Sequence, residues 1–117
     1  MATIKRFQSS ARLSRAVTYN GIAYLAGVTA DDCSYGIEGQ TQQVLATIDA
    51  RLAEVGSDRG RLLSAQIWLK DIARDFDKMN ETWDRWTSPG NAPTRATAQC
   101  EMAEADILIE IIVTAAI

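Results

Sequence analysis

Arg95 and Glu110 are the side chains of this sequence best suited to chemistry on a small acid. Arg95 and Thr97 share one face of the alternating segment 94–101, and Glu110 interrupts the apolar segment 106–116. A guanidinium fork binds a carboxylate through two parallel hydrogen bonds, and a carboxylate can orient or deprotonate a water. The two residues therefore predict either a site for a ligand carboxylate beside a water, or a structural ion pair.

A hairpin would bring these side chains together. With Met102–Ala105 as its loop, Thr97 lies opposite Glu110 and Arg95 one diagonal step away, about 7–8 Å between Cβ atoms. We expect all three on one face, which meets a partner subunit. We expect the opposite face, packed on the helices, to carry three small side chains: Ala96, Ala98 and Cys100.

The composition excludes several classes of site. The chain has no histidine, which removes the usual general base and the commonest zinc ligand, and it has no Cys-x-x-Cys or Gly-x-Gly-x-x-Gly spacing. We therefore expect no metal and no cofactor. The net charge of −3 disfavours nucleic acid as a partner. One basic cluster remains, which is either a solvated or subunit-facing surface or a patch that faces an anion: Lys5, Arg6, Arg12 and Arg15.

Length and hydropathy indicate one soluble domain over residues 1–117. The longest apolar run near the C-terminus, 111–117, is far shorter than the roughly 20 residues that span a bilayer. The N-terminus lacks the apolar region of a signal peptide, and two cysteines are too few for a disulfide framework. We expect a cytoplasmic protein.

The elements that position these residues follow from periodicity. Amphipathic spacing predicts helices over 37–55 and 72–86, and alternation or apolar runs predict six strands. We expect these strands at Thr3–Gln8, Arg15–Tyr19, Ile22–Ala26, Leu62–Leu69, Thr94–Glu101 and Asp106–Ala116. The order is β-β-β-α-β-α-β-β, an α+β domain with two helices on one face of the sheet. Since the last strand is apolar on both faces, its second face predicts contact with another subunit.

Three segments resemble the RidA/YjgF family over nearly the whole chain. They are Ala92–Thr97 followed by Glu110, Tyr24–Gly27, and Lys70–Asp71 with Met79–Trp83. The resemblance implies a chorismate-mutase-like fold with a mixed sheet, assembled as a homotrimer with clefts between subunits. It also implies an enamine/imine deaminase that converts 2-aminoacrylate and 2-imino acids to 2-keto acids and ammonia.

Carried over residue by residue, the resemblance assigns roles in such a cleft. Arg95 would clamp the substrate carboxylate and Glu110 would position the attacking water. Backbone groups at Gly27 and Thr97 would border the substrate, and Asn80 matches a family asparagine near the cleft. The sequence departs from the archetype at two positions, which hold a Tyr and often a Cys in the family: Leu13 and Thr97.

Two alternatives stay open. One is a non-catalytic trimeric module that binds a small carboxylate metabolite or a protein partner. The other is an endoribonuclease, a name also given to the family, against which the net negative charge and the missing histidine argue.

Overall fold

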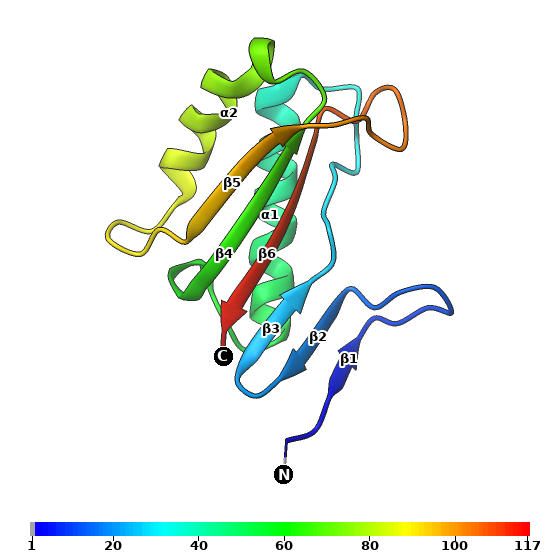
Figure 1. Cartoon of the computed structure of the whole chain (residues 1–117), viewed down its shortest axis with the longest axis vertical. Helices are drawn as coiled ribbons and strands as arrows, with labels where there is room; N and C mark the ends of the chain where they lie inside the picture. Colours follow the sequence, from blue (N-terminus) through cyan, green and yellow to red (C-terminus); the bar gives the residue numbers. More distant parts are fainter. Residues whose placement is uncertain (1) are drawn as a thin grey trace.

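A mixed sheet of six strands forms the framework of the computed structural model, which describes residues 2–117 (Figure 1). Along the sheet the strand order is β1-β2-β3-β6-β4-β5; β4 and β5 run parallel and the other neighbours antiparallel. The strands are β1 (Lys5–Phe7), β2 (Ala16–Tyr19), β3 (Ile22–Leu25), β4 (Leu62–Leu69), β5 (Thr94–Gln99) and β6 (Ile109–Ala116). Each predicted strand is confirmed, most with shorter ends.

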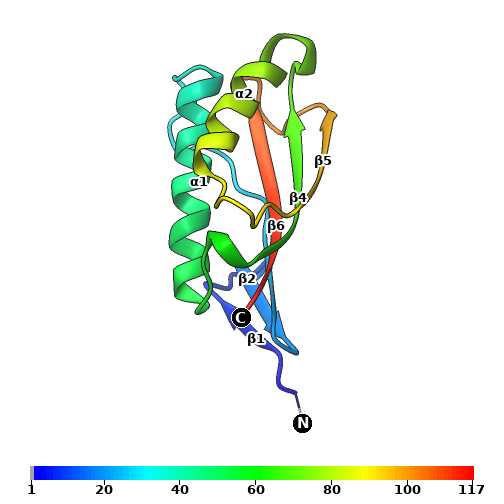
Figure 2. The same ribbon diagram turned by 90° about the vertical axis from the view of Figure 1, so that its left-hand side faces the viewer.

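Two helices cover one face of this sheet, as predicted (Figure 2). They are α1 (Ile37–Glu54) and α2 (Ile72–Trp86), and a 3-10 turn, η1 (Arg59–Arg61), precedes β4. The apolar stripe of α1 is buried throughout, and Gly56 ends the helix with a φ of +83°. Asp71 caps α2 by accepting a hydrogen bond from the amide of Arg74 at 3.1 Å.

The turn between β2 and β3 follows from the local sequence, whereas two apolar side chains are more exposed than their spacing predicts. Asn20 and Gly21 have φ of 53° and 77°, as a type I′ turn between β2 and β3 requires. Leu63 of β4 alternates in step with the buried Ala65, but a register shift between Leu62 and Ser64 leaves it 45% exposed. Phe76 has the spacing of the apolar stripe of α2 but is 36% exposed.

The predicted hairpin of the last two strands is wrong. β5 pairs with β4 in parallel, with Arg95 beside Ala65, and β6 lies between β3 and β4. The segment 100–108 therefore crosses the end of β4 instead of forming a tight turn (Figure 1). A strand that is apolar on both faces is best placed in the middle of a sheet, whereas the polar alternation of β5 suits an edge.

The face of the sheet away from the helices carries no element of the chain among residues 2–117 (Figure 2). Tyr24 on β3 is 46% exposed and Trp68 on β4 is 36% exposed, and Ile112 on β6 is partly exposed. We call this surface the outer face. Within the described residues, no helix is long and apolar enough to cross a membrane.

Candidate functional site

Arg95 and Thr97 lie on the helix side of the edge strand, which corrects the sequence-based assignment of faces. Their in-register neighbours on β4, Ala65 and Ile67, are buried beneath the helices. The small residues Ala96 and Ala98 instead lie on the outer face. The alternation of β5 was therefore identified correctly, but the face that meets the helices was reversed.

The guanidinium of Arg95 lies over the ring of Trp83, with 5.6 Å from Cζ to the ring centroid. Trp83 comes from α2 and is 5% exposed, so the ring is a fixed support. Within residues 2–117 Arg95 makes no ion pair. Arg95 and Glu110 therefore form no ion pair within one chain, and a structural ion pair at an interface between subunits stays a prediction beside a ligand site.

Two buried polar atoms without partners lie on the same elements as Arg95. Between residues 2 and 117, the Oδ1 of Asn80 and the Oγ1 of Thr97 have no hydrogen-bond partner. Asn80 precedes Trp83 by three residues, about 4.5 Å along the helix, and Thr97 follows Arg95 by two, about 6.6 Å along the strand. Since α2 and β5 run in opposite directions, Asn80 and Thr97 lie at similar levels. A buried acceptor or hydroxyl without a partner indicates a missing ligand, water or subunit.

Glu110 and Gly27 form a second cluster, which is on the outer face. Glu110 is in register with Trp68 of β4, whose ring is exposed on that face. A Cβ placed on Gly27 would overlap the Glu110 carboxylate and lie 3.0 Å from its Cδ. Within the described chain, neither the amide nor the carbonyl of Gly27 has a backbone hydrogen-bond partner. The Glu110 carboxylate thus lies against a backbone segment whose peptide groups are free to bind a ligand.

The two clusters are far apart within one chain. Arg95 pairs with Ala65 and Glu110 with Trp68, so two strand spacings and three residues separate them, about 14 Å between Cα atoms. They also point to opposite faces of the sheet. We call them the arginine half (Arg95, Thr97, Asn80, Trp83) and the glutamate half (Glu110, Gly27). One chain cannot present both halves to one small molecule, but two chains packed on each other can.

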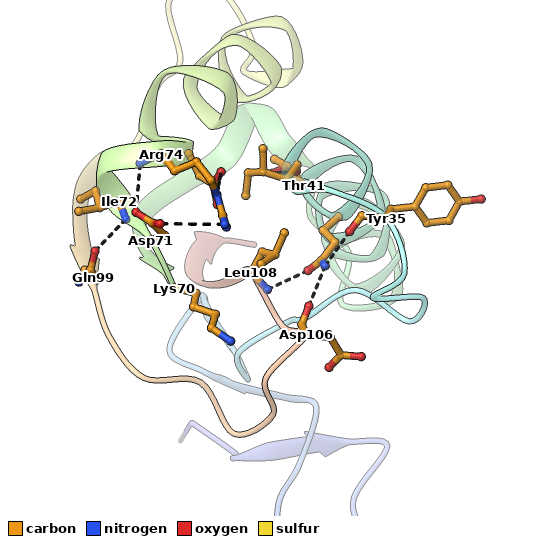
Figure 3. Close-up of polar contacts among 12 residues, drawn as sticks. Tyr35, Thr41, Lys70, Asp71, Ile72, Arg74, Gln99, Asp106 and Leu108 are labelled. Carbon is orange, nitrogen blue, oxygen red and sulfur yellow. Dashed lines mark hydrogen bonds and ion pairs between the residues drawn. The ribbon is translucent and has the colours of Figure 1, made fainter.

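A buried amide fixes the segments that lead to the glutamate half. Gln40 of α1 is fully buried; its Nε2 donates to the carbonyls of Tyr35 and Asp106 at 2.9 Å, and its Oε1 accepts from the amide of Leu108 at 3.0 Å. Figure 3 shows Tyr35, Asp106 and Leu108 converging beside this helix. Sequence analysis missed Gln40, although a glutamine on the apolar stripe of α1 was a visible signal.

The remaining candidates for chemistry lie elsewhere. Burial, followed by nearby carboxylates, raises the pKa of the Cys33 thiol, which disfavours a thiolate nucleophile. Cys100, expected in the core, is half-buried. Among residues 2–117, no cluster of three or more Cys, Asp or Glu could hold a metal ion.

Comparisons with known proteins agree over nearly the whole chain. The family model described as Endoribonuclease L-PSP matches residues 3–117. A RutC family protein of Haemophilus ducreyi is 43% identical over 97% of both chains. A structure from Neisseria meningitidis, described as a member of the YjgF protein family, is 38% identical, covers 97% of this chain and 94% of its own, and superposes with a TM-score of 0.94. The chloroplastic Reactive Intermediate Deaminase A of Arabidopsis thaliana is 32% identical over 84% of this chain and 54% of its own.

Proposed function

This chain belongs to the RidA/YjgF family, whose model carries the description Endoribonuclease L-PSP, and we propose that it is a cofactor-independent enamine/imine deaminase. Its substrates are 2-aminoacrylate-type enamines and 2-imino acids, and its products are 2-keto acids and ammonia. The observation that carries the proposal is the Arg95 guanidinium, which rests on Trp83 without an anionic partner in the described chain. The name of the plant relative, Reactive Intermediate Deaminase A, supports the same reaction class.

The site is completed between subunits, which we propose form a homotrimer. The arginine half of one chain faces the glutamate half of the next, because the two halves lie on opposite faces of each sheet. The uncovered outer face, with Tyr24 and Trp68 exposed, supports such packing. A repeated contact between two different surfaces closes into a trimeric ring when each chain is rotated by a third of a turn from the last.

In this site Arg95 binds the substrate carboxylate through two parallel hydrogen bonds. Glu110 accepts a proton from a water, whose oxygen adds to the imine carbon while the C=N electron pair moves to nitrogen and takes up a proton. The carbinolamine then collapses: the hydroxyl proton is transferred to the amino nitrogen, the C–O group becomes the carbonyl, the C–N bond breaks and ammonia leaves. An imine is already electrophilic, so positioning and proton transfer suffice. The buried Oδ1 of Asn80 can accept a hydrogen bond from the substrate nitrogen.

The test is the decay of 2-iminopropanoate and 2-iminobutanoate generated by an amino-acid oxidase, with and without the protein. We expect faster decay with the wild type and at least a 100-fold loss of kcat/KM in Glu110→Gln. The matched control is Glu81→Gln on the exposed side of α2, which should retain full activity. Unchanged imine decay with folded wild-type protein would contradict deaminase activity. If 2-keto acids still bind in an Arg95-dependent way, the alternative of a non-catalytic binding module is favoured.

A further inference from the structure

The loop that joins β1 and β2 encloses a basic hollow of about 510 Å³ that the proposed reaction does not yet use. Arg12 and Arg15 line it together with Leu13, Gln8 and two serines. Leu13 is 46% exposed there, so the hollow combines two guanidinium groups with one apolar wall. Part of the basic cluster seen in the sequence is therefore gathered around a concave surface.

The positive charge of this hollow is not neutralised within the described chain. Neither Arg12 nor Arg15 forms an ion pair among residues 2–117. Glu54, the carboxylate on the neighbouring part of α1, accepts a hydrogen bond from Gln8 at 2.6 Å. Burial and then repulsion from Arg15 lower the pKa of Arg51 on α1, and the carboxylates of Glu54 and Asp31 oppose this shift. Such a surface favours an anion.

The hollow is attached to the glutamate half. The carbonyl of Arg15 accepts a hydrogen bond from the amide of Ala26 at 3.0 Å, and Ala26 is followed by Gly27, which abuts the Glu110 carboxylate. One main-chain hydrogen bond therefore joins the end of the loop to the segment that contacts Glu110. In the assembly proposed above, Arg95 of the neighbouring chain holds one end of the ligand, and the loop is joined to the Glu110 side through Ala26 and Gly27.

We propose that Arg12 and Arg15 form a subsite for a second carboxylate, so that the preferred substrates are 2-imino dicarboxylates, derived from acidic amino acids. This inference rests on the proposed deaminase function and adds the substrate class. Arg95 binds the carboxylate next to the imine carbon, and the loop guanidinium groups bind the side-chain carboxylate. Arginine suits this role because each fork can make two charge-assisted hydrogen bonds to one carboxylate.

The experiment compares kcat/KM for 2-iminoglutarate with that for 2-iminobutanoate, each generated by an oxidase. We expect wild type to favour the dicarboxylate at least tenfold at low salt, and the preference to fall as salt rises. The double variant Arg12→Gln/Arg15→Gln should lose this preference while changing hydrolysis of 2-iminobutanoate less than twofold. Arg6→Gln is the matched control, since Arg6 belongs to the same basic cluster but does not line the hollow.

A parallel binding measurement separates failure of the subsite from failure of the proposed function. The probes are 2-oxoglutarate and 2-oxobutanoate, titrated into the oligomer by calorimetry. If neither imine is hydrolysed but 2-oxoglutarate binds at least tenfold tighter in an Arg12- and Arg15-dependent way, the deaminase proposal fails and the subsite stands. Equal binding and equal turnover of the two classes, or an equal loss for both in the double variant, would overturn the subsite.

Discussion

The arginine half and the glutamate half of the candidate site are built in different ways. The arginine half lies on an edge strand against α2, where Trp83 supports Arg95 and two buried polar atoms lack partners. The glutamate half lies on the central strand β6, and Gln40 binds the segment before it through two hydrogen bonds. The arginine half has polar atoms without a partner in the described chain, whereas hydrogen bonds within the chain hold the segment before the glutamate half. The proposed mechanism accordingly assigns binding of the substrate carboxylate to the first half and placement of the proton acceptor to the second.

Mixing two inactive variants tests whether the halves work across subunits. Arg95→Ala and Glu110→Ala should each lose at least about 100-fold in imine hydrolysis, because one lacks the carboxylate clamp and the other the proton acceptor. When the two chains are co-refolded in equal amounts, random pairing restores both residues at about a quarter of the sites, so about a quarter of wild-type activity should return.

The control is each variant refolded alone, which should stay inactive. Recovery is expected because an Arg95→Ala chain still supplies Glu110 and a Glu110→Ala chain still supplies Arg95. If the mixed oligomer remains as inactive as its parents, both residues act from one chain and the placement on opposite faces has been misjudged.

The internal support of the glutamate half predicts a large loss of stability in Gln40→Leu. Leucine fills similar space but leaves the carbonyls of Tyr35 and Asp106 and the amide of Leu108 without their partner. We expect the free energy of unfolding to fall by about 2–4 kcal/mol, measured by urea denaturation. The same substitution at exposed Gln42 should change it by less than about 0.5 kcal/mol. Comparable values for the two variants would show that the buried amide does not support these segments.

Gly27→Ala should lower activity more than stability. The added methyl group would overlap the Glu110 carboxylate, which is the end of a flexible side chain and can rotate away at little cost. We expect about a tenfold loss of kcat/KM from the displaced carboxylate and a nearly unchanged melting temperature. Gly36→Ala is the control, because a Cβ there meets nothing within 4 Å and its φ is −75°. An active Gly27→Ala enzyme would mean that Glu110 does not act from this position.

The sequence predicted the elements of both halves but not how they meet. Helix and strand periods are local, and so is the turn at Asn20 and Gly21. The position of a strand in the sheet depends on distant partners: β6 lies in the centre because both its faces are apolar, and the strand-helix-strand unit from β4 through α2 to β5 gives a parallel pair. The strand-helix-strand spacing could have indicated the parallel pair of β4 and β5. The short segment before β6 instead led to the prediction of a hairpin between the last two strands.

Arg95 could be identified as a candidate from the sequence, but its surroundings could not. A guanidinium in a strand of small side chains is a local feature of the sequence. The face of β5 that meets the helices depends on the neighbouring strand, where Ala65 and Ile67 are buried. Because the sequence did not show that β4 is this neighbour, Arg95 and Glu110 were predicted on the same face. The spacing of Trp83 in α2 is that of a core residue, and Trp83 is buried, but its ring also supports Arg95.

Thr97→Val gives the smallest expected change and the sharpest contrast between the halves. Valine has nearly the shape of threonine, and the Thr97 hydroxyl has no partner in the described chain, so the free energy of unfolding should change by less than about 0.5 kcal/mol. Thr41→Val is the matched control: its buried hydroxyl donates to the carbonyl of Ile37 at 2.7 Å, and its loss should cost about 1 kcal/mol without affecting imine hydrolysis. A few-fold loss of kcat/KM in Thr97→Val alone would show that this hydroxyl binds a ligand or the next subunit. Destabilisation of Thr97→Val equal to that of Thr41→Val would mean that the hydroxyl is already bonded within its own chain, and the arginine half would then be as self-contained as the glutamate half.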